Sequence, residues 1–150
     1  MRTEYTTTIA CPPERLWTFL EEPELQKQWM KGLLANEPTS GHRTVGSTFR
    51  LKIQEGRRVA EYDGEVTARD QPRHLGIRFW GGNMPKGMIM RVDYRLAAAA
   101  DGTRLDYLAE LESGSFPFML KLLLPLIQLF SRWQLRRFMQ TLKQLAEAPA

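Results

Sequence analysis

The two histidines and the single cysteine are the side chains of this 150-residue sequence with the most direct access to catalytic or metal chemistry. His42 and His74 lie far apart, and no carboxylate stands at ligand spacing from either, so the pattern does not favour a metal site. His42 is the better catalytic candidate, because its predicted loop can border the mouth of a cavity. Cys11 stands before two prolines and is expected to be a small turn residue rather than a reactive thiol. The sequence therefore predicts no catalytic residue and no metal ligand.

Glycines and tyrosines offer the remaining chemistry. Gly81-Gly82 and Gly87 bracket a hairpin without a following helix, so they do not form a phosphate-binding loop, and no cofactor is predicted. The apolar faces of the predicted strands carry no Asp, Glu, His, Lys or Arg, and their only polar groups are tyrosine hydroxyls. Met88 and Met90 beside Tyr94 are typical of an adaptable apolar wall with one hydrogen-bonding point. The alternative is that methionines fill the core and tyrosines bond only to backbone or water.

The elements that position these residues follow from the spacing of apolar side chains. Period-two alternation predicts strands, each with one buried face, at residues 3–9, 49–54, 61–66, 75–80, 88–96 and 105–111. Two short helices are expected after Pro12-Pro13, the first ending at Pro23 and the second covering residues 24–29. From Pro117 to about residue 146 the period becomes helical, with a kink or break expected at Pro125. The outer sheet face, with Asp63, Arg78 and Asp93, is expected to be solvated and ion-paired.

Composition limits the classes of partner and location. Hydrophobic residues make up 43% of the chain and charged residues 25%, as in ordinary globular proteins. The net charge of +4 is spread along the chain, so no nucleic-acid footprint is predicted. One cysteine allows no internal disulfide and fits a reducing compartment, so a cytoplasmic location is expected. The most apolar stretch, Phe116 to Phe130, is interrupted by Lys121 and Pro125, and no membrane-spanning segment is predicted.

Several motifs resemble those of a known superfamily. The run Ile9 to Leu20, the later Pro23-Glu24-Leu25, and Tyr62 to Val66 are similar to START-like, helix-grip proteins of the SRPBCC superfamily. More narrowly, with Pro72 to Leu75 and the closing helix Arg136 to Leu145, they resemble the polyketide cyclase/dehydrase-like branch. The resemblance implies one START-like domain over residues 1–150. It also implies an α+β helix-grip fold, in which a curved antiparallel sheet of about seven strands, two short helices and a long C-terminal helix enclose a cavity.

The resemblance leaves the function open, because its members include lipid carriers, hormone receptors and aromatase/cyclases. The first hypothesis is binding or transport of an apolar or aromatic molecule such as a lipid, isoprenoid, quinone or polyketide. The second is a cyclase/dehydratase-type enzyme that uses cavity tyrosines. The third is a lipid carrier that touches a membrane surface through Phe116 to Phe130; the alternatives are that this segment packs wholly inside the protein or against a second copy in a homodimer. The expected ligand-binding residues line one cavity: Tyr62, Phe79, Met88, Met90, Tyr94, Tyr107, Phe118 and Leu122.

Overall fold

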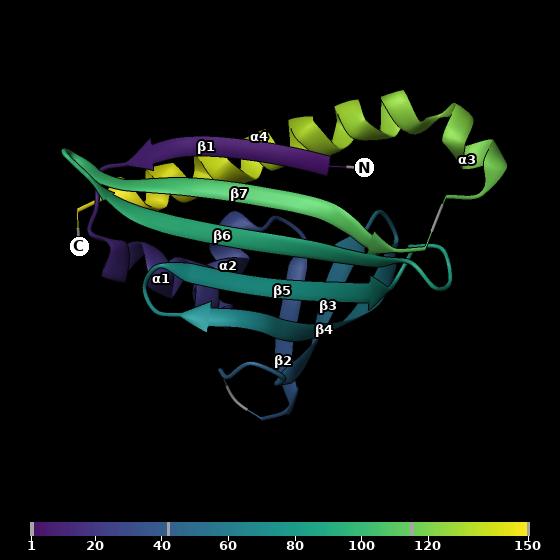
Figure 1. Ribbon diagram of the computed structural model, residues 1–150, viewed down its shortest axis with the longest axis horizontal. Coiled ribbons are helices and arrows are strands. Elements are labelled where there is room, and N and C mark those ends of the chain that lie inside the picture. The colour runs from purple at the N-terminus through teal and green to yellow at the C-terminus, as the bar shows by residue number, and fades with distance from the viewer. Residues whose placement is uncertain (1, 42, 115, 150) are drawn as a thin grey trace.

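The computed structural model describes residues 2–41, 43–114 and 116–149, which form one antiparallel sheet and four helices (Figure 1). The strands are β1 (Arg2–Ile9), β2 (Leu33–Ser40), β3 (Thr48–Glu55), β4 (Arg58–Asp70), β5 (His74–Gly81), β6 (Ile89–Ala99) and β7 (Gly102–Ser113). The helices are α1 (Pro13–Glu21), α2 (Pro23–Trp29), α3 (Phe118–Leu122) and α4 (Leu124–Glu147). The predicted α+β class and order of elements are confirmed.

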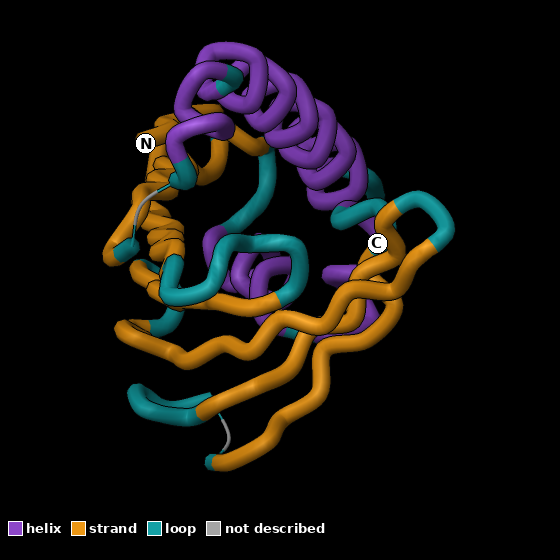
Figure 2. The backbone as a smooth tube through the Cα atoms, turned by 90° about the vertical axis from the view of Figure 1, so that its right-hand side faces the viewer, coloured by secondary structure: helices purple, strands orange, loops and turns teal. Residues whose placement is uncertain are grey.

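The sheet has the strand order β1-β7-β6-β5-β4-β3-β2, with every neighbouring pair antiparallel. β1 and β2 are therefore the two edges, and α1 and α2 carry the chain from one edge to the other. The sheet curves around the helices, which lie on its concave side (Figure 2). Register shifts in the β4–β5 and β6–β7 pairs contribute to this curvature, because a bulge bends and twists its strand. The helix-grip architecture expected from the sequence is confirmed.

β2 is the strand that the apolar alternation does not predict. Half of its residues are polar, it contains Pro38, and it is buried at Leu33 alone. An edge strand tolerates proline and polar residues because one side of its backbone pairs with no neighbour. The pairing with β3 shifts register twice, once after Leu33 and once after Pro38. β2 is thus held by its backbone pairing rather than by an apolar face, and a period-two search misses it.

The C-terminal helix is interrupted where proline predicts a break. α3 ends at Leu122, Leu123 lies between the helices, and Pro125 occupies the first turn of α4. A proline is tolerated there because the first N–H groups of a helix have no intrahelical partner.

Only the distal part of α4 is fully buried. Its buried residues are Met139, Leu142 and Ala146, which belong to the main core with α1 and the centre of the sheet. Arg15 donates to the carbonyl oxygens of Ala146 and Ala148 at 2.8 and 3.0 Å, which satisfies the open end of the helix. The sheet therefore grips α4 by its C-terminal half.

The outer sheet face carries cross-strand ion pairs, as expected. The Arg50 guanidinium lies 3.2 Å from the Asp63 carboxylate, and Arg78 lies 3.1 Å from Glu65. Asp93 departs from the expectation of a solvated face, because it is only 4% exposed. The His74 ring nitrogen Nε2 lies 2.7 Å from one of its carboxylate oxygens. The Arg91 guanidinium lies 3.2 Å from the other. His74 is thus accounted for as a partner of a buried carboxylate.

Candidate binding pocket

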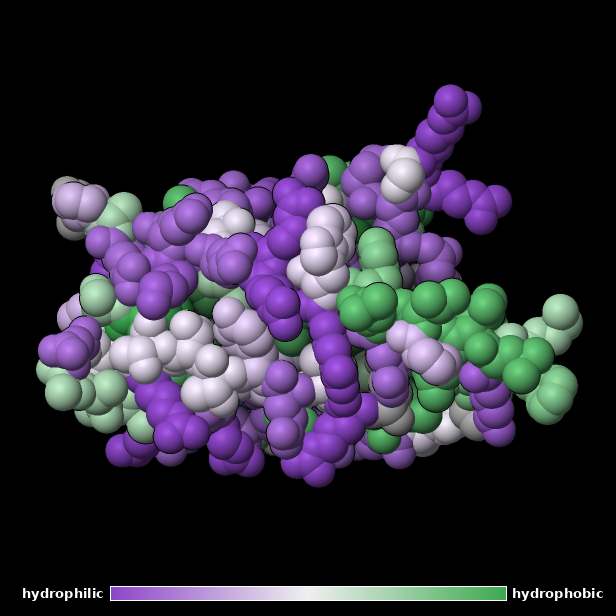
Figure 3. All heavy atoms as spheres, turned by 90° about the horizontal axis from the view of Figure 1, so that it is seen from above, coloured by the Kyte–Doolittle hydropathy of each residue, from purple (hydrophilic) through white to green (hydrophobic). Residues whose placement is uncertain are grey.

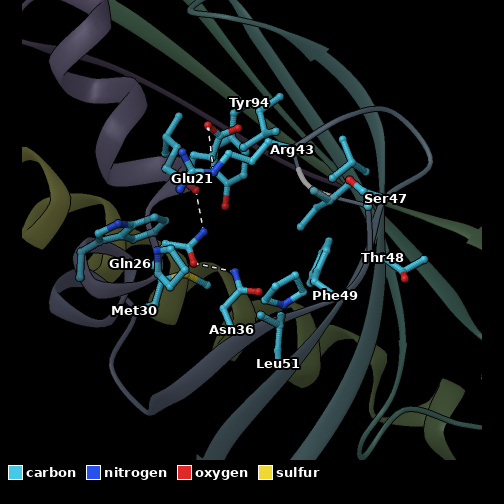
Figure 4. Close-up of a pocket in the computed structure, with 18 residues that line it drawn as sticks. Glu21, Gln26, Met30, Asn36, Arg43, Ser47, Thr48, Phe49, Leu51 and Tyr94 are labelled. Atoms are coloured by element: carbon cyan, nitrogen blue, oxygen red, sulfur yellow. Dashed lines mark hydrogen bonds and ion pairs between the residues drawn. The ribbon is translucent and has the colours of Figure 1, made fainter.

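A pocket of about 140 Å³ lies on the concave side of the sheet, between α1–α2 and strands β2 to β6 (Figure 4). This volume is close to that of a cavity that holds one benzene ring, about 150 Å³, but the pocket is open to solvent on one side, so a larger molecule can extend out of it. The helical side and the β2–β3 loop contribute Leu20, Glu21, Pro23, Gln26, Trp29, Met30, Gly41 and Arg43. The strands and their ends contribute Asn36, Pro38, Ser47, Thr48, Phe49, Leu51, Val66, Leu75, Ile77 and Tyr94.

The sheet wall of the pocket is apolar and depends on a glycine. Phe49 on β3 pairs with Gly64 on β4, and a Cβ atom at position 64 would lie 2.3 Å from the Phe49 ring. The ring therefore occupies the space that a side chain at position 64 would need. Leu51, Val66 and Ile77 extend the same wall across three strands. This wall can accept a ring or a branched hydrocarbon, but it offers no hydrogen bond.

Two amides, one on α2 and one on β2, line the pocket and are bonded to each other. The Gln26 amide donates to the backbone carbonyl of Leu20 at 2.6 Å and accepts from the Asn36 amide at 2.7 Å. These bonds join α2 to the edge strand β2, so they position the pocket wall. Trp29 is fixed in the same way, since its indole N–H donates to the Phe19 carbonyl at 2.8 Å. The amides thus shape the pocket, and its sheet wall stays apolar.

A carboxylate and a guanidinium also reach the pocket, which corrects the expectation that only phenols face it. Glu21 and Arg43 both line it. Glu21 accepts from Arg69 at 2.7 and 3.0 Å and from the Trp17 indole at 3.2 Å. Burial would raise the pKa of Glu21, but the hydrogen bonds and charge of Arg69 hold it below its usual range. The strand alternation could not show this, because both groups come from a helix end and a loop.

Glu21→Gln is expected to lower the free energy of unfolding by about 1–2 kcal/mol at neutral pH, because the charge-assisted bonds with Arg69 are lost. The pKa of Glu21 is lowered in the folded protein, so this stabilisation is present above its ordinary value of 4.5. It is lost as the pH falls through the folded pKa. Urea unfolding from about pH 7 to about pH 3 should show wild type and variant converging in acid. The matched change Glu24→Gln, on an 83% exposed side chain, should cost under about 0.5 kcal/mol; a pH-independent deficit for Glu21→Gln would contradict this account.

Tyr94 supplies a hydrogen-bonding group to the pocket from the centre of the sheet. It is 8% exposed, and in the described part of the chain its hydroxyl has no hydrogen-bond partner. Burial raises the pKa of Tyr94, so the phenol stays protonated and donates a hydrogen bond. Tyr107 lies edge-on to it at 5.4 Å between ring centroids, and burial raises the pKa of Tyr107 to about 12. Tyr5 pairs with Tyr107 on the edge strand, so three phenols cross the sheet in register.

The remaining residues of the expected ligand site lie outside this pocket. Tyr62 and Phe79 form an edge-on pair at 6.1 Å, and the Tyr62 hydroxyl donates to Glu55. Burial, followed by that hydrogen bond, raises the pKa of Tyr62 to about 12. Met88 and Met90 are buried, and Met88 borders a second hollow beside the β5–β6 loop. The last two members, Phe118 and Leu122, are exposed on α3. The structure thus brings together Tyr94 with Tyr107 and Tyr62 with Phe79, but it does not gather all eight residues around one space.

The described residues hold neither a metal-ligand cluster nor a membrane-spanning helix. Within residues 2–41, 43–114 and 116–149, no three His, Cys, Asp or Glu side chains converge as metal ligands. The catalytic candidate His42 lies outside the described residues. No helix in the described ranges is both long and apolar enough to span a bilayer.

An open antiparallel sheet that wraps around a C-terminal helix and borders an apolar pocket defines a START-like, helix-grip protein. A family model described as polyketide cyclase/dehydrase and lipid transport matches residues 1–147, and the chain belongs to this family. A search of curated proteins finds no match.

Solved structures agree with this fold. Protein TTHA0849 from Thermus thermophilus is 16% identical with a TM-score of 0.76, and 97% of each chain is covered. Protein CV1439 from Chromobacterium violaceum is 14% identical with a TM-score of 0.75, over 99% of this chain and 98% of that one. Protein MLL2253 from Mesorhizobium loti is 22% identical with a TM-score of 0.71, over 97% and 96%. At these identities the structures show the fold alone.

Proposed function

We propose that the chain binds a small apolar molecule that carries a hydrogen-bond acceptor, and that the ligand enters the pocket beneath α1 and α2. The observation that carries this proposal is the apolar pocket of about 140 Å³ with the Tyr94 hydroxyl on its wall. In the described part of the chain this hydroxyl makes no hydrogen bond and is not sealed from solvent, so a ligand oxygen can accept from it in place of water. Among lipids, isoprenoids, quinones and polyketides, this arrangement favours the oxygenated ones. The cytoplasmic location expected from the single cysteine stays a prediction.

A cyclase or dehydratase activity is the second candidate, and Glu21 at the pocket is the observation in its favour. General base catalysis needs a carboxylate that can reach and accept a substrate proton. Here both carboxylate oxygens of Glu21 already accept hydrogen bonds from Arg69. Burial raises the pKa of Tyr94, so at neutral pH the phenol stays protonated and is not available as a phenolate base. These properties favour binding over proton transfer. A membrane-touching lipid carrier is a special case of the binding proposal, in which the ligand is a lipid.

Filling the pocket tests the binding proposal. Ile77→Trp places a large ring on the sheet wall, and the affinity for the neutral dye N-phenyl-1-naphthylamine should fall about 10-fold or more, equivalent to about 1.4 kcal/mol. Dye fluorescence during titration gives the dissociation constant, and circular dichroism checks the fold. Tyr94→Phe should leave this hydrocarbon-like dye unaffected but weaken an oxygenated analogue about fivefold, as expected for one lost hydrogen bond.

Met90→Trp is the matched control on the neighbouring strand. Met90 pairs with Phe79 on the same sheet but does not line the pocket of Figure 4. Unchanged dye binding in Met90→Trp, with loss in Ile77→Trp, supports the pocket beneath α1 and α2. Loss in Met90→Trp alone would place the ligand along the residues expected from the sequence. Dye binding that survives both substitutions in folded proteins would refute the binding proposal at this face of the sheet.

A further inference from the structure

The outward side of α3 and of the first half of α4 is an exposed apolar surface, named here the α3–α4 apolar face. Figure 3 shows hydrophobic residues gathered at this end of the molecule, whereas the rest of the same view is mainly hydrophilic. Its members are Phe118, Met119, Leu122, Leu123, Leu126, Leu129, Phe130 and Trp133, each at least 49% exposed. Water-exposed apolar patches of this kind mark sites of interaction.

This face is not the side of the helix that the sheet covers. Leu126, Phe130 and Trp133 are spaced by four and three residues, so they lie on one side of α4. Leu124, Ile127 and others on the opposite side are half-buried. The buried residues of α4 all lie nearer its C-terminus, from Met139 onward. The segment therefore has two apolar sides, and the sheet accounts for one.

The charges around the face have a single sign. Between Gly114 and Ala146 the sequence holds Lys121, Arg132, Arg136, Arg137 and Lys143, and no Asp or Glu. Lys143 bonds to the Thr8 carbonyl oxygen and lies near Glu147. The other four are exposed, and in the described ranges none lies within 4.0 Å of a carboxylate oxygen. The Arg137 guanidinium lies 4.8 Å from the centre of the Trp133 ring, which joins a cation to the edge of the apolar face.

We infer that the α3–α4 apolar face docks onto an anionic lipid bilayer. An interfacial helix inserts apolar side chains at the level of the headgroups, while flanking cations meet anionic lipid phosphates and carboxylates. Trp133 has the amphipathic ring that is favoured at that depth. No described helix can span the bilayer, so α3 and α4 would lie along its surface. Apolar burial and charge attraction then act on the same face.

A second copy of the chain fits this face less well. A two-fold dimer apposes the same surface patch from both subunits. Arg132, Arg136 and Arg137 would then approach their own copies, and the segment provides no carboxylate to neutralise them. An anionic bilayer provides that charge in excess. This inference goes beyond the pocket proposal and does not depend on it, because docking needs no ligand.

Vesicle sedimentation tests the inference on the full chain without added ligand. The protein should bind phosphatidylcholine vesicles that contain about 30 mol% phosphatidylserine at least roughly 10-fold more tightly than vesicles of phosphatidylcholine alone. Raising NaCl from about 0.1 M to about 0.5 M should weaken binding to the anionic vesicles, since salt screens the attraction between the cations of the protein and the lipid headgroups. Absence of binding to the anionic vesicles would overturn the inference.

Two sets of variants separate the contribution of charge to vesicle binding from the contribution of apolar burial. The triple change Arg132→Gln, Arg136→Gln and Arg137→Gln should lower the vesicle partition coefficient about 100-fold, at about fivefold per charge. The double change Leu126→Ser and Phe130→Ser should lower it roughly 30-fold. The matched controls are Arg57→Gln, Arg58→Gln and Arg95→Gln combined, and Val45→Ser with Val59→Ser, all at exposed positions remote in sequence from α3 and α4. The vesicle partition coefficient of both control variants should remain within about threefold of the wild-type value.

The vesicle binding of these variants decides between bilayer docking and its alternatives. Equal losses in the test and control sets would overturn the inference, because binding would then follow net charge or total apolar surface alone. A stable dimer in analytical ultracentrifugation that the Leu126→Ser and Phe130→Ser change dissociates would also overturn it, by assigning the face to a second copy. Loss in the test variants of a monomeric protein, with unaltered dye binding in the pocket, supports bilayer docking.

Discussion

Leu142→Ala is expected to lower the free energy of unfolding by about 2–5 kcal/mol, the range for a leucine removed from a closed core. Leu142 is 0% exposed and packs with Leu16, Trp17 and Met139 in the main core. The Arg15 bonds to the end of α4 limit how far the helix can move to close the cavity. The substitution therefore removes contacts that the structure cannot easily rebuild. Urea unfolding measures the change, with the dependence of the unfolding free energy on urea concentration held equal for wild type and variant.

Leu126→Ala is the matched control within the same helix. Leu126 is 64% exposed on the α3–α4 apolar face, so the same chemical change should alter stability by less than about 0.5 kcal/mol. The contrast measures how unevenly the sheet grips α4. A loss at Leu126 as large as the loss at Leu142 would show that the first half of the helix is packed in solution.

The fold could be predicted from the sequence because most of its strands have one exposed face and one buried face. β4 shows why: Tyr62, Gly64 and Val66 are buried while Asp63 and Glu65 are less so, and period-two alternation reports this directly. The break before α4 was also predictable, since proline acts through local geometry. β2 was not predictable, because an edge strand is specified by a partner that is distant in sequence. The assignment of residues 1–150 to one domain stays a prediction.

The pocket was harder to predict than the fold. Tyr94 could be found because strand alternation places it on the concave face. Glu21 and Arg43 could not, since they come from a helix end and a loop, where no periodicity indicates which way a side chain points; Gln26 lies in a helix of seven residues, too short for a clear apolar stripe. Phe118 and Leu122 show the opposite difficulty. The helical segment that carries them has apolar residues on two sides, and sequence alone does not say which side meets the sheet.

Gly102→Ala is expected to be the most damaging single methyl addition in the chain. Gly102 has a φ of 147°, and a Cβ atom there would lie 2.1 Å from the carbonyl oxygen of Ile9 and 2.9 Å from the Cα of Ala10. Both contacts are with backbone, so no side-chain rotation can relieve them. The next residue, Thr103, bonds to the Cys11 carbonyl at 2.8 Å, which ties the β6–β7 turn to the chain entering α1. The methyl group must therefore push apart the end of β1 and this turn.

The expected cost is about 3 kcal/mol or more, because over-packing against a fixed backbone adds to the strain of an unfavourable φ. Gly56 is the matched control: its φ is 61°, yet nothing lies within 4 Å of the position that a methyl group would take, so Gly56→Ala should cost only about 1 kcal/mol. Thermal unfolding followed by circular dichroism compares the two variants with wild type. Equal losses at both glycines would mean that φ alone matters and that the β6–β7 turn does not hold the segment from Ile9 to Cys11. A much larger loss at Gly102 would show that this contact fixes α1, and with it the helical side of the pocket.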